Sequence, residues 1–295
     1  MRVIVYEEPG VKWGEPLPND WHLAGLELKR QLIEAGFDVF GEHECVPDPD
    51  QDIALYFDTL MRPQGHPVMH KRSIYISLEP PVVGNQQRFY DRINGWPYTR
   101  ILTFSKAHVD DKRVFYSPFP NVRYERKFPT KIVFNPTKIN IDDLRQNTPG
   151  SIIRVDDVKA FNTIAIDERT GDMVAITANK TSGHPAELYS ARREVYRAMG
   201  KKLHLYGHGW RTDPICNFVD YRGPCEHIFP VFQQYKYAIS IENQYLEGYC
   251  SEKYWTPLQA GCELIRIGWK PDFALSDCDE KGWAKRIVEH VEAIA

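Results

Sequence analysis

The feature that most constrains the fold is a recurring alternation of short apolar runs with segments that can form helices. Apolar runs rich in β-branched residues stand at residues 2–6, 53–57, 73–78 and 101–104. Strands that read as nearly continuous apolar runs are typical of parallel sheets that are buried on both faces. The alternation therefore predicts the α/β class, with a parallel sheet.

A second series of the same kind begins near residue 173. The strands expected there are 173–177, 202–206, 237–241 and 263–267, and the helices are 185–199, 225–235, 251–260 and 280–294. Two successive α/β series predict two Rossmann-like domains that face a cleft, with a ligand at the carboxyl ends of the strands. We place the domains at residues 1–123 and 172–295. Residues 124–171, where prolines interrupt short β-rich pieces, are expected to form an interdomain excursion or a small β insertion.

Composition excludes several classes of protein. The chain of 295 residues has 42% hydrophobic and 26% charged residues, an ordinary globular composition that excludes disorder, collagen and coiled coil. The apolar runs are too short to span a bilayer, and the N-terminus lacks the apolar core of a secretory signal. The six cysteines form no C-x-x-C pair, so we expect free thiols in a reducing cytoplasm.

The stretch from residue 237 to residue 255 carries the most informative chemistry. A strand ends at Glu242 and Asn243, a short loop follows, and Ser251 can cap a helix whose first turn holds Glu252 and Lys253. Free backbone N–H groups and the positive end of a helix favour an anion, and Lys253 adds a full charge. This suits a diphosphate, with Glu252 accepting hydrogen bonds from sugar or ribose hydroxyls. The alternative is a plain serine cap followed by two solvated charges.

This stretch resembles the nucleotide-sugar motif of the α1,3-fucosyltransferases, glycosyltransferase family 10, which reads roughly F-E-N and then Y-x-T-E-K. Here the motif is I-E-N at residues 241–243 and Y-C-S-E-K at residues 249–253, so Tyr249 joins the expected donor site. The family's Asp before the tyrosine is Gly248 in this chain. The resemblance is to a phage or bacterial member, and it covers most of the chain apart from about residues 124–171.

Other matches follow in the same order as in the family. Residues 175–182, A-I-T-A-N-K-T-S, resemble a family strand that ends in S-N-x-x-S, which makes Asn179 a donor-site candidate. On the next helix an arginine of the family reaches the donor diphosphate; Arg192 fits best by spacing, and Arg193 is the second choice. Residues 76–81, I-S-L-E-P-P, resemble the family's E-S-P motif and contain Glu79.

The resemblance implies a GT-B fold with an N-terminal acceptor domain and a C-terminal donor domain. It also implies an inverting transfer of a sugar, by family default fucose from GDP-fucose, in which Glu79 removes the proton of the acceptor hydroxyl. Lys253 and Arg192 would neutralise the leaving diphosphate. No metal or other cofactor is expected. The D-x-D at residues 48–50, the metal motif of the other glycosyltransferase fold, is interpreted as a turn.

The acceptor side carries an excess of basic residues. Between residues 70 and 138, thirteen Lys and Arg stand against five acidic residues, a local charge of +8 that leaves −11 for the rest of a chain whose net charge is −3. Aromatic residues are interleaved with them. A polyanionic acceptor fits this balance, either a glycan such as phosphorylated lipopolysaccharide core or DNA that bears a hydroxylated base. The alternative is a basic face that an acidic domain balances.

Two further interpretations remain open. One is a phage-type enzyme that transfers a sugar, such as a pentose, from a UDP-sugar to hydroxylated DNA bases. The other belongs to a different class, a non-catalytic module that binds nucleotide sugars or nucleic acid. The protein is expected in the cytoplasm of a bacterial or phage-infected cell.

Overall fold

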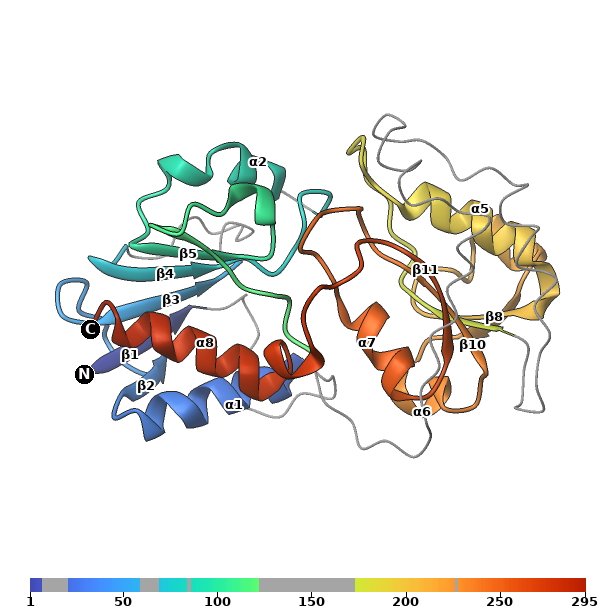
Figure 1. The fold of residues 1–295 in the computed structure, drawn as a ribbon. Coiled ribbons are helices and arrows are strands. Elements are labelled where there is room, and N and C mark those ends of the chain that lie inside the picture. The colour runs from blue at the N-terminus through green and yellow to red at the C-terminus, as the bar shows by residue number, and fades with distance from the viewer. Residues whose placement is uncertain (7–20, 59–68, 84–85, 122–172, 226–227) are drawn as a thin grey trace. The chain divides into compact units, whose positions relative to one another are not determined.

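The computed structural model describes residues 1–6, 21–58, 69–83, 86–121, 173–225 and 228–295 (Figure 1). The chain divides into two units. Unit 1 comprises Met1–Arg123, Leu246–Cys250 and Trp269–Ala295, and unit 2 comprises Tyr124–Tyr245 and Ser251–Gly268. The excursion or insertion expected at residues 124–171 lies outside the described residues.

Unit 1 is built on a sheet of six parallel strands. They are β1 (Arg2–Tyr6), β2 (Asp38–Gly41), β3 (Ile53–Phe57), β4 (Arg72–Ile76), β5 (Arg100–Thr103) and β6 (Val114–Tyr116). Their order across the sheet is β2-β1-β3-β4-β5-β6, and every neighbouring pair is parallel. β3 is buried over its whole length, as its apolar sequence predicts.

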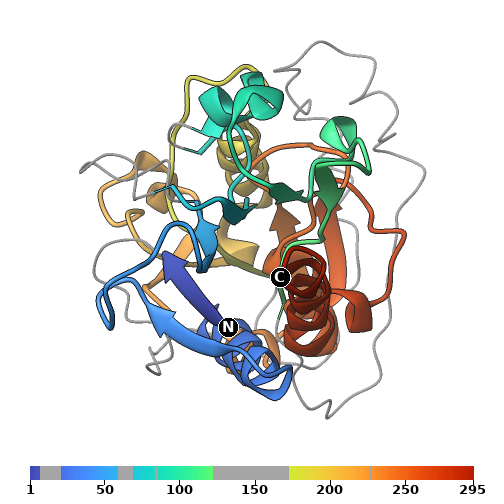
Figure 2. The ribbon, with the colours of Figure 1, turned by 90° about the vertical axis from the view of Figure 1, so that its left-hand side faces the viewer.

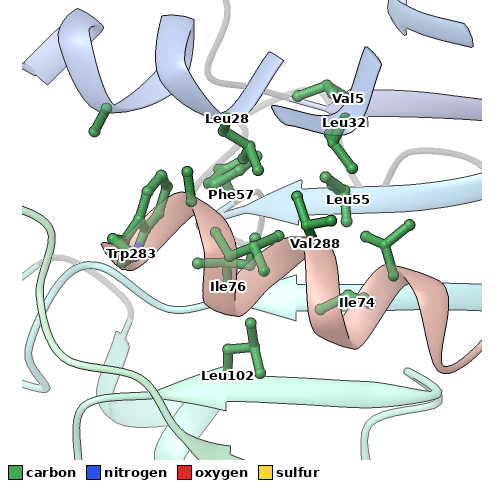
Figure 3. Close-up of a cluster of buried hydrophobic side chains, with 14 of the residues drawn as sticks. Val5, Leu28, Leu32, Leu55, Phe57, Ile74, Ile76, Leu102, Trp283 and Val288 are labelled. Carbon is green, nitrogen blue, oxygen red and sulfur yellow. The ribbon is translucent and has the colours of Figure 1, made fainter. Parts of the chain in front are cut away.

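Helices cover both faces of the unit 1 sheet. α1 (Trp21–Glu34) and α8 (Glu280–Glu292) lie side by side on one face, and α2 (Gln86–Asp91) covers the other (Figure 1, Figure 2). Alternate strand residues supply the two faces because successive side chains of a strand point to opposite sides. The core under α1 and α8 includes Leu28, Leu32, Leu55, Ile76, Trp283 and Val288 (Figure 3). The core under α2 includes Tyr56, Tyr75, Phe89 and Ile101.

Unit 2 is built on a sheet of five parallel strands. They are β7 (Met173–Ile176), β8 (Leu203–Tyr206), β9 (Asp220–Gly223), β10 (Tyr237–Ile241) and β11 (Glu263–Ile267), in the order β11-β10-β7-β8-β9. Its helices are α5 (Tyr189–Met199), α6 (Ile228–Phe232) and α7 (Glu252–Gln259). The chain places β8 and β9 on one side of β7, then β10 and β11 on the other side. The strand order therefore reverses between β7 and β10, and open α/β sheets bind ligands at such a switch point, beyond the carboxyl ends of the strands.

Short 3-10 turns complete the described structure, at Ile93–Gly95, Lys106–His108, Gly200–Lys202, Pro214–Asn217 and Leu275–Asp277. Across the ranges given above, no helix combines the length and the apolar character that crossing a membrane requires.

The predicted α/β class with two Rossmann-like units, which a GT-B-like fold requires, is confirmed. Two helices differ from their predicted bounds by more than one turn or by several residues, while α7 and α8 differ by two residues each. α5 begins at Tyr189 instead of residue 185, because Glu187 pairs with Gln244 and the Leu188 N–H donates to Asn243 O before the helix begins. α6 extends only over Ile228–Phe232 within the predicted range 225–235.

The units are not contiguous in sequence. Leu246–Cys250 and Trp269–Ala295 belong to unit 1, although the domain placed at residues 172–295 includes them. The reason lies in α8, whose buried face packs against α1 and the unit 1 sheet through Trp283, Ile287 and Val291. The chain therefore crosses between the units several times.

Candidate functional site

Five of the candidate donor residues lie where β10 ends and α7 begins, two elements that Figure 1 labels: Glu242, Asn243, Ser251, Glu252 and Lys253. β10 ends at Ile241, and Ser251 is the N-cap of α7, with Glu252 and Lys253 in the first turn. A serine is favoured at this position because its hydroxyl can accept a hydrogen bond from a free N–H of the first turn. Ser251 Oγ accepts from the Lys253 N–H at 3.3 Å. The helix therefore starts beside the switch point of the unit 2 sheet.

Glu242 supports this helix start from the interior. Its side chain is fully buried, and its carboxylate accepts hydrogen bonds from the Ser251 N–H at 3.0 Å and from the Ser251 hydroxyl at 2.6 Å. Arg266 of β11, which is also buried, places Nη2 3.9 Å from Glu242 Oε1. Glu242 was expected to bind the donor, and in the structure its carboxylate holds the loop and the helix start.

Lys253 and Glu252 form an ion pair in the first turn. Lys253 Nζ lies 2.8 Å from Glu252 Oε1 and 3.4 Å from Ser251 Oγ, and 15% of the lysine side chain is exposed. Burial lowers the pKa of Lys253, but the carboxylates of Glu252 and Glu242 outweigh burial and leave the pKa above its ordinary value. Burial raises the pKa of Glu252, but the charge of Lys253 opposes burial, and the pKa is lowered from its ordinary value. Both side chains are therefore charged at neutral pH.

The ion pair borders a cavity of about 20 Å³, which is room for about one water molecule. The lining residues are Ile176, Thr177, Ile228, Phe232, Ile239, Ser240, Glu252 and Lys253. Ser240 Oγ is buried and has no hydrogen-bond partner in the described part of the chain. An unpaired buried hydroxyl costs about 1–3 kcal/mol, so a polar occupant of this cavity would stabilise unit 2.

Arg192 of α5 lies close to the ion pair. The residue is 2% exposed, and Nη2 donates to Ile241 O at 2.8 Å, to Glu242 O at 3.3 Å and to Asn243 Oδ1 at 3.3 Å. Asn243, another expected donor-binding residue, thus holds the arginine. Arg192 Nε is buried without a hydrogen-bond partner among the described residues. The guanidinium is near enough to act on the pKa of Lys253, so the two cations lie near each other and away from bulk water.

A second network joins the segment after β7 to α5. Asn179 Nδ2 donates to Gly209 O and to Asp213 Oδ2, each at 3.0 Å, and Asn179 Oδ1 accepts from Arg193. Arg193 Nε lies 3.4 Å from the same Asp213 oxygen. Asn179 therefore uses its amide within the protein. Arg193 has a carboxylate partner, whereas the contacts of Arg192 are to neutral oxygens. The positive charge of Arg192 is therefore available to a bound anion.

Tyr249 lies in the core of unit 1. The residue is 2% exposed, and its ring centroid lies 4.8 Å from that of Phe104 and 6.0 Å from that of Phe119. A core residue therefore occupies the position at which a donor-binding tyrosine was expected. The neighbouring Gly248 has a φ of +92°, and a Cβ there would lie 1.9 Å from Phe104 O. No side chain fits at this position, which explains why the chain carries glycine where the family has Asp.

Glu79 follows β4 at the carboxyl edge of the unit 1 sheet and is half-buried. Sequence reasoning did not single out Asp58, which follows the neighbouring β3, is 6% exposed and has a φ of 43°. The Asp58 carboxylate accepts from the Leu78 N–H at 3.0 Å and from Gln86 Nε2 at 3.0 Å, and so fixes the backbone just before Glu79. An acidic residue directly after a buried apolar run was the available signal for Asp58, whereas Glu79 was identified by the resemblance of residues 76–81.

The basic window at residues 70–138 lies partly outside the described residues. Within the described part, these cations have partners: Lys71 with Asp50, Arg72 with Ala295 O, Arg100 with His290, Lys106 with Asp272 and Arg113 with Trp96 O. Arg88 and Arg92, on and after α2, are exposed. Most of the described cations of the window therefore have a partner within unit 1.

The D-x-D at residues 48–50 forms a turn, as predicted. Asp48 Oδ1 accepts from the N–H groups of Asp50 at 2.9 Å and Gln51 at 3.3 Å, and Asp50 forms an ion pair with Lys71 at 2.9 Å. Over the described ranges, no group of three or more His, Cys, Asp or Glu side chains is arranged to hold a metal ion.

Comparison with solved structures finds distant similarities. WaaG, a glycosyltransferase involved in lipopolysaccharide biosynthesis, is 10% identical with a TM-score of 0.47, over 99% of this chain and 90% of that one. An α1,3-fucosyltransferase with GDP is 12% identical with a TM-score of 0.44, over 99% and 79%. An α-glucosyltransferase in complex with UDP-glucose and DNA containing an abasic site is 10% identical with a TM-score of 0.34, over 92% and 80%. At these TM-scores the similarities establish no activity for this chain. No protein-family model matches it, and a search of curated proteins finds no match.

Proposed function

We propose that this chain is an inverting glycosyltransferase, which moves a sugar from a nucleoside-diphosphate sugar to a hydroxyl group of an acceptor. The observation that carries the proposal is the start of α7, where a charged Lys253 and a capped helix N-terminus stand at the switch point of a parallel sheet. Helix N-termini bind phosphate groups through free N–H groups and a partial positive charge. The resemblance of residues 241–253 to a nucleotide-sugar motif supports the same assignment.

The balance of charges at the start of α7 favours the binding of an anion. Lys253 is paired with the Glu252 carboxylate and Arg266 with that of Glu242, while Arg192 contacts neutral oxygens, which leaves one net positive charge. A diphosphate that reaches Lys253 would replace Glu252 as its partner. The Glu252 side chain is 43% exposed. Once released, its carboxylate could accept hydrogen bonds from ribose hydroxyls.

The proposed reaction is a single displacement at the anomeric carbon of the donor sugar. The acceptor oxygen forms a bond to this carbon while the bond from the carbon to the diphosphate breaks, and the electron pair leaves with the diphosphate. Lys253 and Arg192 stabilise the negative charge on the leaving group. Glu79 takes the proton of the acceptor hydroxyl, a step for which a carboxylate at a strand end is suited.

The first candidate donor follows from the resemblance, and the candidate acceptors follow from the basic window at residues 70–138. GDP-fucose is the first candidate donor, and a UDP-sugar such as a UDP-pentose is the second. The candidate acceptors are a glycan, such as lipopolysaccharide core, and DNA with a hydroxylated base. The proposal needs no bound metal or other cofactor, because Lys253 and Arg192 supply positive charge to the leaving diphosphate.

The test is a panel of GDP- and UDP-sugars, incubated with the protein and with methyl glycosides, lipopolysaccharide core or DNA containing 5-hydroxymethylcytosine. Released nucleoside diphosphate is measured. The Glu79→Gln variant removes the base and keeps the shape of the side chain, and Glu289→Gln, at an exposed position of α8, is the control. We expect Glu79→Gln to lower turnover by about 10²- to 10⁴-fold with unchanged binding of the nucleotide. We expect EDTA to leave the turnover in place.

Three outcomes count against the proposal. Turnover by Glu79→Gln at the wild-type rate would remove Glu79 from its role. Binding of nucleotide without any transfer or hydrolysis would favour a non-catalytic module. Complete loss of activity in EDTA would show that the reaction needs a metal ion.

A further inference from the structure

A polar network lines the carboxyl edge of the unit 1 sheet beside Glu79. Ser77 Oγ lies 3.0 Å from the hydroxyl of Tyr90, and this hydroxyl lies 3.3 Å from Thr103 Oγ1. Thr103 Oγ1 accepts from the Ser105 N–H at 3.1 Å. Because Ser77 follows β4 and Thr103 ends β5, the network joins the ends of two neighbouring strands.

His108 stands at the end of this network. It is the last residue of the 3-10 turn Lys106–His108, and its Nδ1 lies 2.7 Å from Ser105 Oγ. The imidazole packs against the ring of Tyr90, with centroids 5.1 Å apart. Nε2 has no hydrogen-bond partner within the ranges that the structure describes, and the side chain is half-buried. The protein thus fixes one nitrogen of the ring and leaves the other available.

The strand register brings His108 to the same edge as Glu79. Ile76 of β4 is paired with Leu102 of β5. Glu79 stands three residues beyond Ile76, and Ser105, which holds His108, stands three residues beyond Leu102. Both side chains therefore belong to the ends of the same pair of strands.

The surroundings of His108 favour a neutral imidazole. Burial lowers the pKa of His108 below its ordinary value, and the carboxylate of Asp91, at the end of α2, opposes this effect. The other groups beside His108 are the Tyr90 hydroxyl and Lys106, whose ammonium is paired with Asp272 at 2.6 Å. A neutral imidazole that carries its proton on Nδ1 presents a lone pair at Nε2.

We propose that His108 binds the acceptor: Nδ1–H donates to Ser105 Oγ, and Nε2 accepts a hydrogen bond from a hydroxyl that neighbours the one Glu79 deprotonates. This inference rests on the proposed function, which makes unit 1 the acceptor side. It names the class of acceptor as a molecule with adjacent hydroxyl groups, such as a sugar ring. A hydroxylated base, whose hydroxymethyl group carries a single hydroxyl, does not offer this pair.

Two variants distinguish the contribution of the imidazole nitrogens from that of ring packing. His108→Phe keeps an aromatic ring against Tyr90 and removes both nitrogens. His108→Gln offers an amide oxygen near the position of Nε2 and does not titrate. His43→Phe is the control, because the His43 side chain is 88% exposed.

The probes are methyl glycosides as acceptors, with hydrolysis of the donor by water as the reference reaction. At pH 7.5 we expect His108→Phe to raise the KM for the glycoside about tenfold, because one hydrogen bond to the acceptor is lost. The rate of donor hydrolysis should be unchanged. We expect His108→Gln to restore most of this affinity. In the wild type, this KM should rise when the pH falls below the pKa of His108, which burial lowers from its ordinary value of about 6.5, because the imidazolium cannot accept a hydrogen bond. In His108→Gln that rise should be absent.

Three results would overturn the role of His108: an unchanged KM in His108→Phe, a persisting pH dependence in His108→Gln, or transfer to DNA with hydroxylated bases but to no methyl glycoside. The last result would leave the proposed function standing. If the wild type neither transfers nor hydrolyses any donor, the proposed function fails. In that case, ¹⁵N NMR of the imidazole tests the role of His108 by identifying its tautomer. The inference requires the Nδ1–H tautomer, and an Nε2–H tautomer contradicts it.

Discussion

The guanidinium of Arg192 is bound to the end of β10 and still has unused donors. Its Nη2 contacts three oxygens of residues 241–243, while Nε is buried without a partner in the described chain. An arginine carries five N–H donors in a rigid fork, so one side chain can hold a strand end and also reach an anion. The family resemblance placed a donor-binding arginine on this helix, and spacing favoured Arg192, but neither reveals the partners that a side chain finds across the sheet.

The other motif residues differ in the same way: some could be placed from the sequence, and others have partners that the sequence does not reveal. Lys253 and Glu252 could be placed from the sequence, because a capped helix start fixes where its first turn points. The burial of Glu242 and the core position of Tyr249 could not, because both depend on packing against Arg266 and Phe104, which are distant in sequence.

Glu242→Gln should destabilise unit 2 and leave its surface charge unchanged. The amide loses the negative charge that faces buried Arg266, and its NH2 group cannot accept from Ser251. Breaking a buried ion pair by removing one partner costs about 3–5 kcal/mol. Urea unfolding monitored by circular dichroism measures the loss.

The control for this prediction is Glu263→Gln. Glu263 forms a more exposed pair with Lys236 at 3.8 Å, with side chains 16% and 23% exposed. Such pairs contribute about 0–1 kcal/mol. Equal stability losses in the two variants would show that Glu242 is not the internal support of the helix start.

At the scale of elements, the strands were the most predictable part of the fold. β3, β10 and β11 have the bounds that the sequence predicts. β3 and β10 are buried over their whole length, and such strands need mostly apolar residues. Helix starts were less predictable. The backbone before α5 pairs with residues 243–244, so the helix begins later than its apolar pattern indicates.

The segment before α7 depends on a glycine. At Gly248 a Cβ would lie 1.9 Å from Phe104 O, and the φ of +92° is unfavourable for other residues. Gly248→Ala should therefore lower the unfolding free energy by about 2 kcal/mol or more. Thermal and urea unfolding test this.

Gly183→Ala is the matched variant, because no atom lies within 4 Å of a Cβ at that position. Its stability should change by about 0.5 kcal/mol or less. A Gly248→Ala protein as stable as Gly183→Ala would contradict the described packing of residues 246–250.

At the scale of the whole molecule, the division into units could be predicted only in part. Two α/β series in the sequence indicate two parallel sheets, and both are present. The assignment of α8 to unit 1 could not be foreseen, because an amphipathic pattern shows that a helix has a buried face and not which sheet covers it.

Unit 1 should lose stability in mild acid. Burial lowers the pKa values of His70 and His108, and burial with the charges of Arg100 and Arg286 lowers the pKa of His290 to about 4. The unfolded chain therefore binds more protons than the folded one between about pH 6.5 and pH 4, and stability falls as the pH falls through this window.

Urea midpoints measured from pH 7.5 to pH 4.5 test this prediction. His290→Gln keeps an acceptor for Arg100 and does not titrate, so its midpoint should fall less steeply than that of the wild type. Exposed His43 provides the control, since His43→Gln should leave the slope unchanged. A wild-type midpoint that is constant over this range would contradict the burial of these histidines.

The binding of a nucleoside diphosphate at the start of α7 is the claim on which the functional account depends. Isothermal titration of GDP and UDP into the wild type, Lys253→Ala and Lys202→Ala tests it most directly, because Lys202 is an exposed lysine of the same unit. The account predicts that one of the nucleotides binds to the wild type and to Lys202→Ala equally well, and at least about tenfold more weakly to Lys253→Ala, or 1.4 kcal/mol. Wild-type affinity in Lys253→Ala, or no binding of either nucleotide to the wild type, would contradict it.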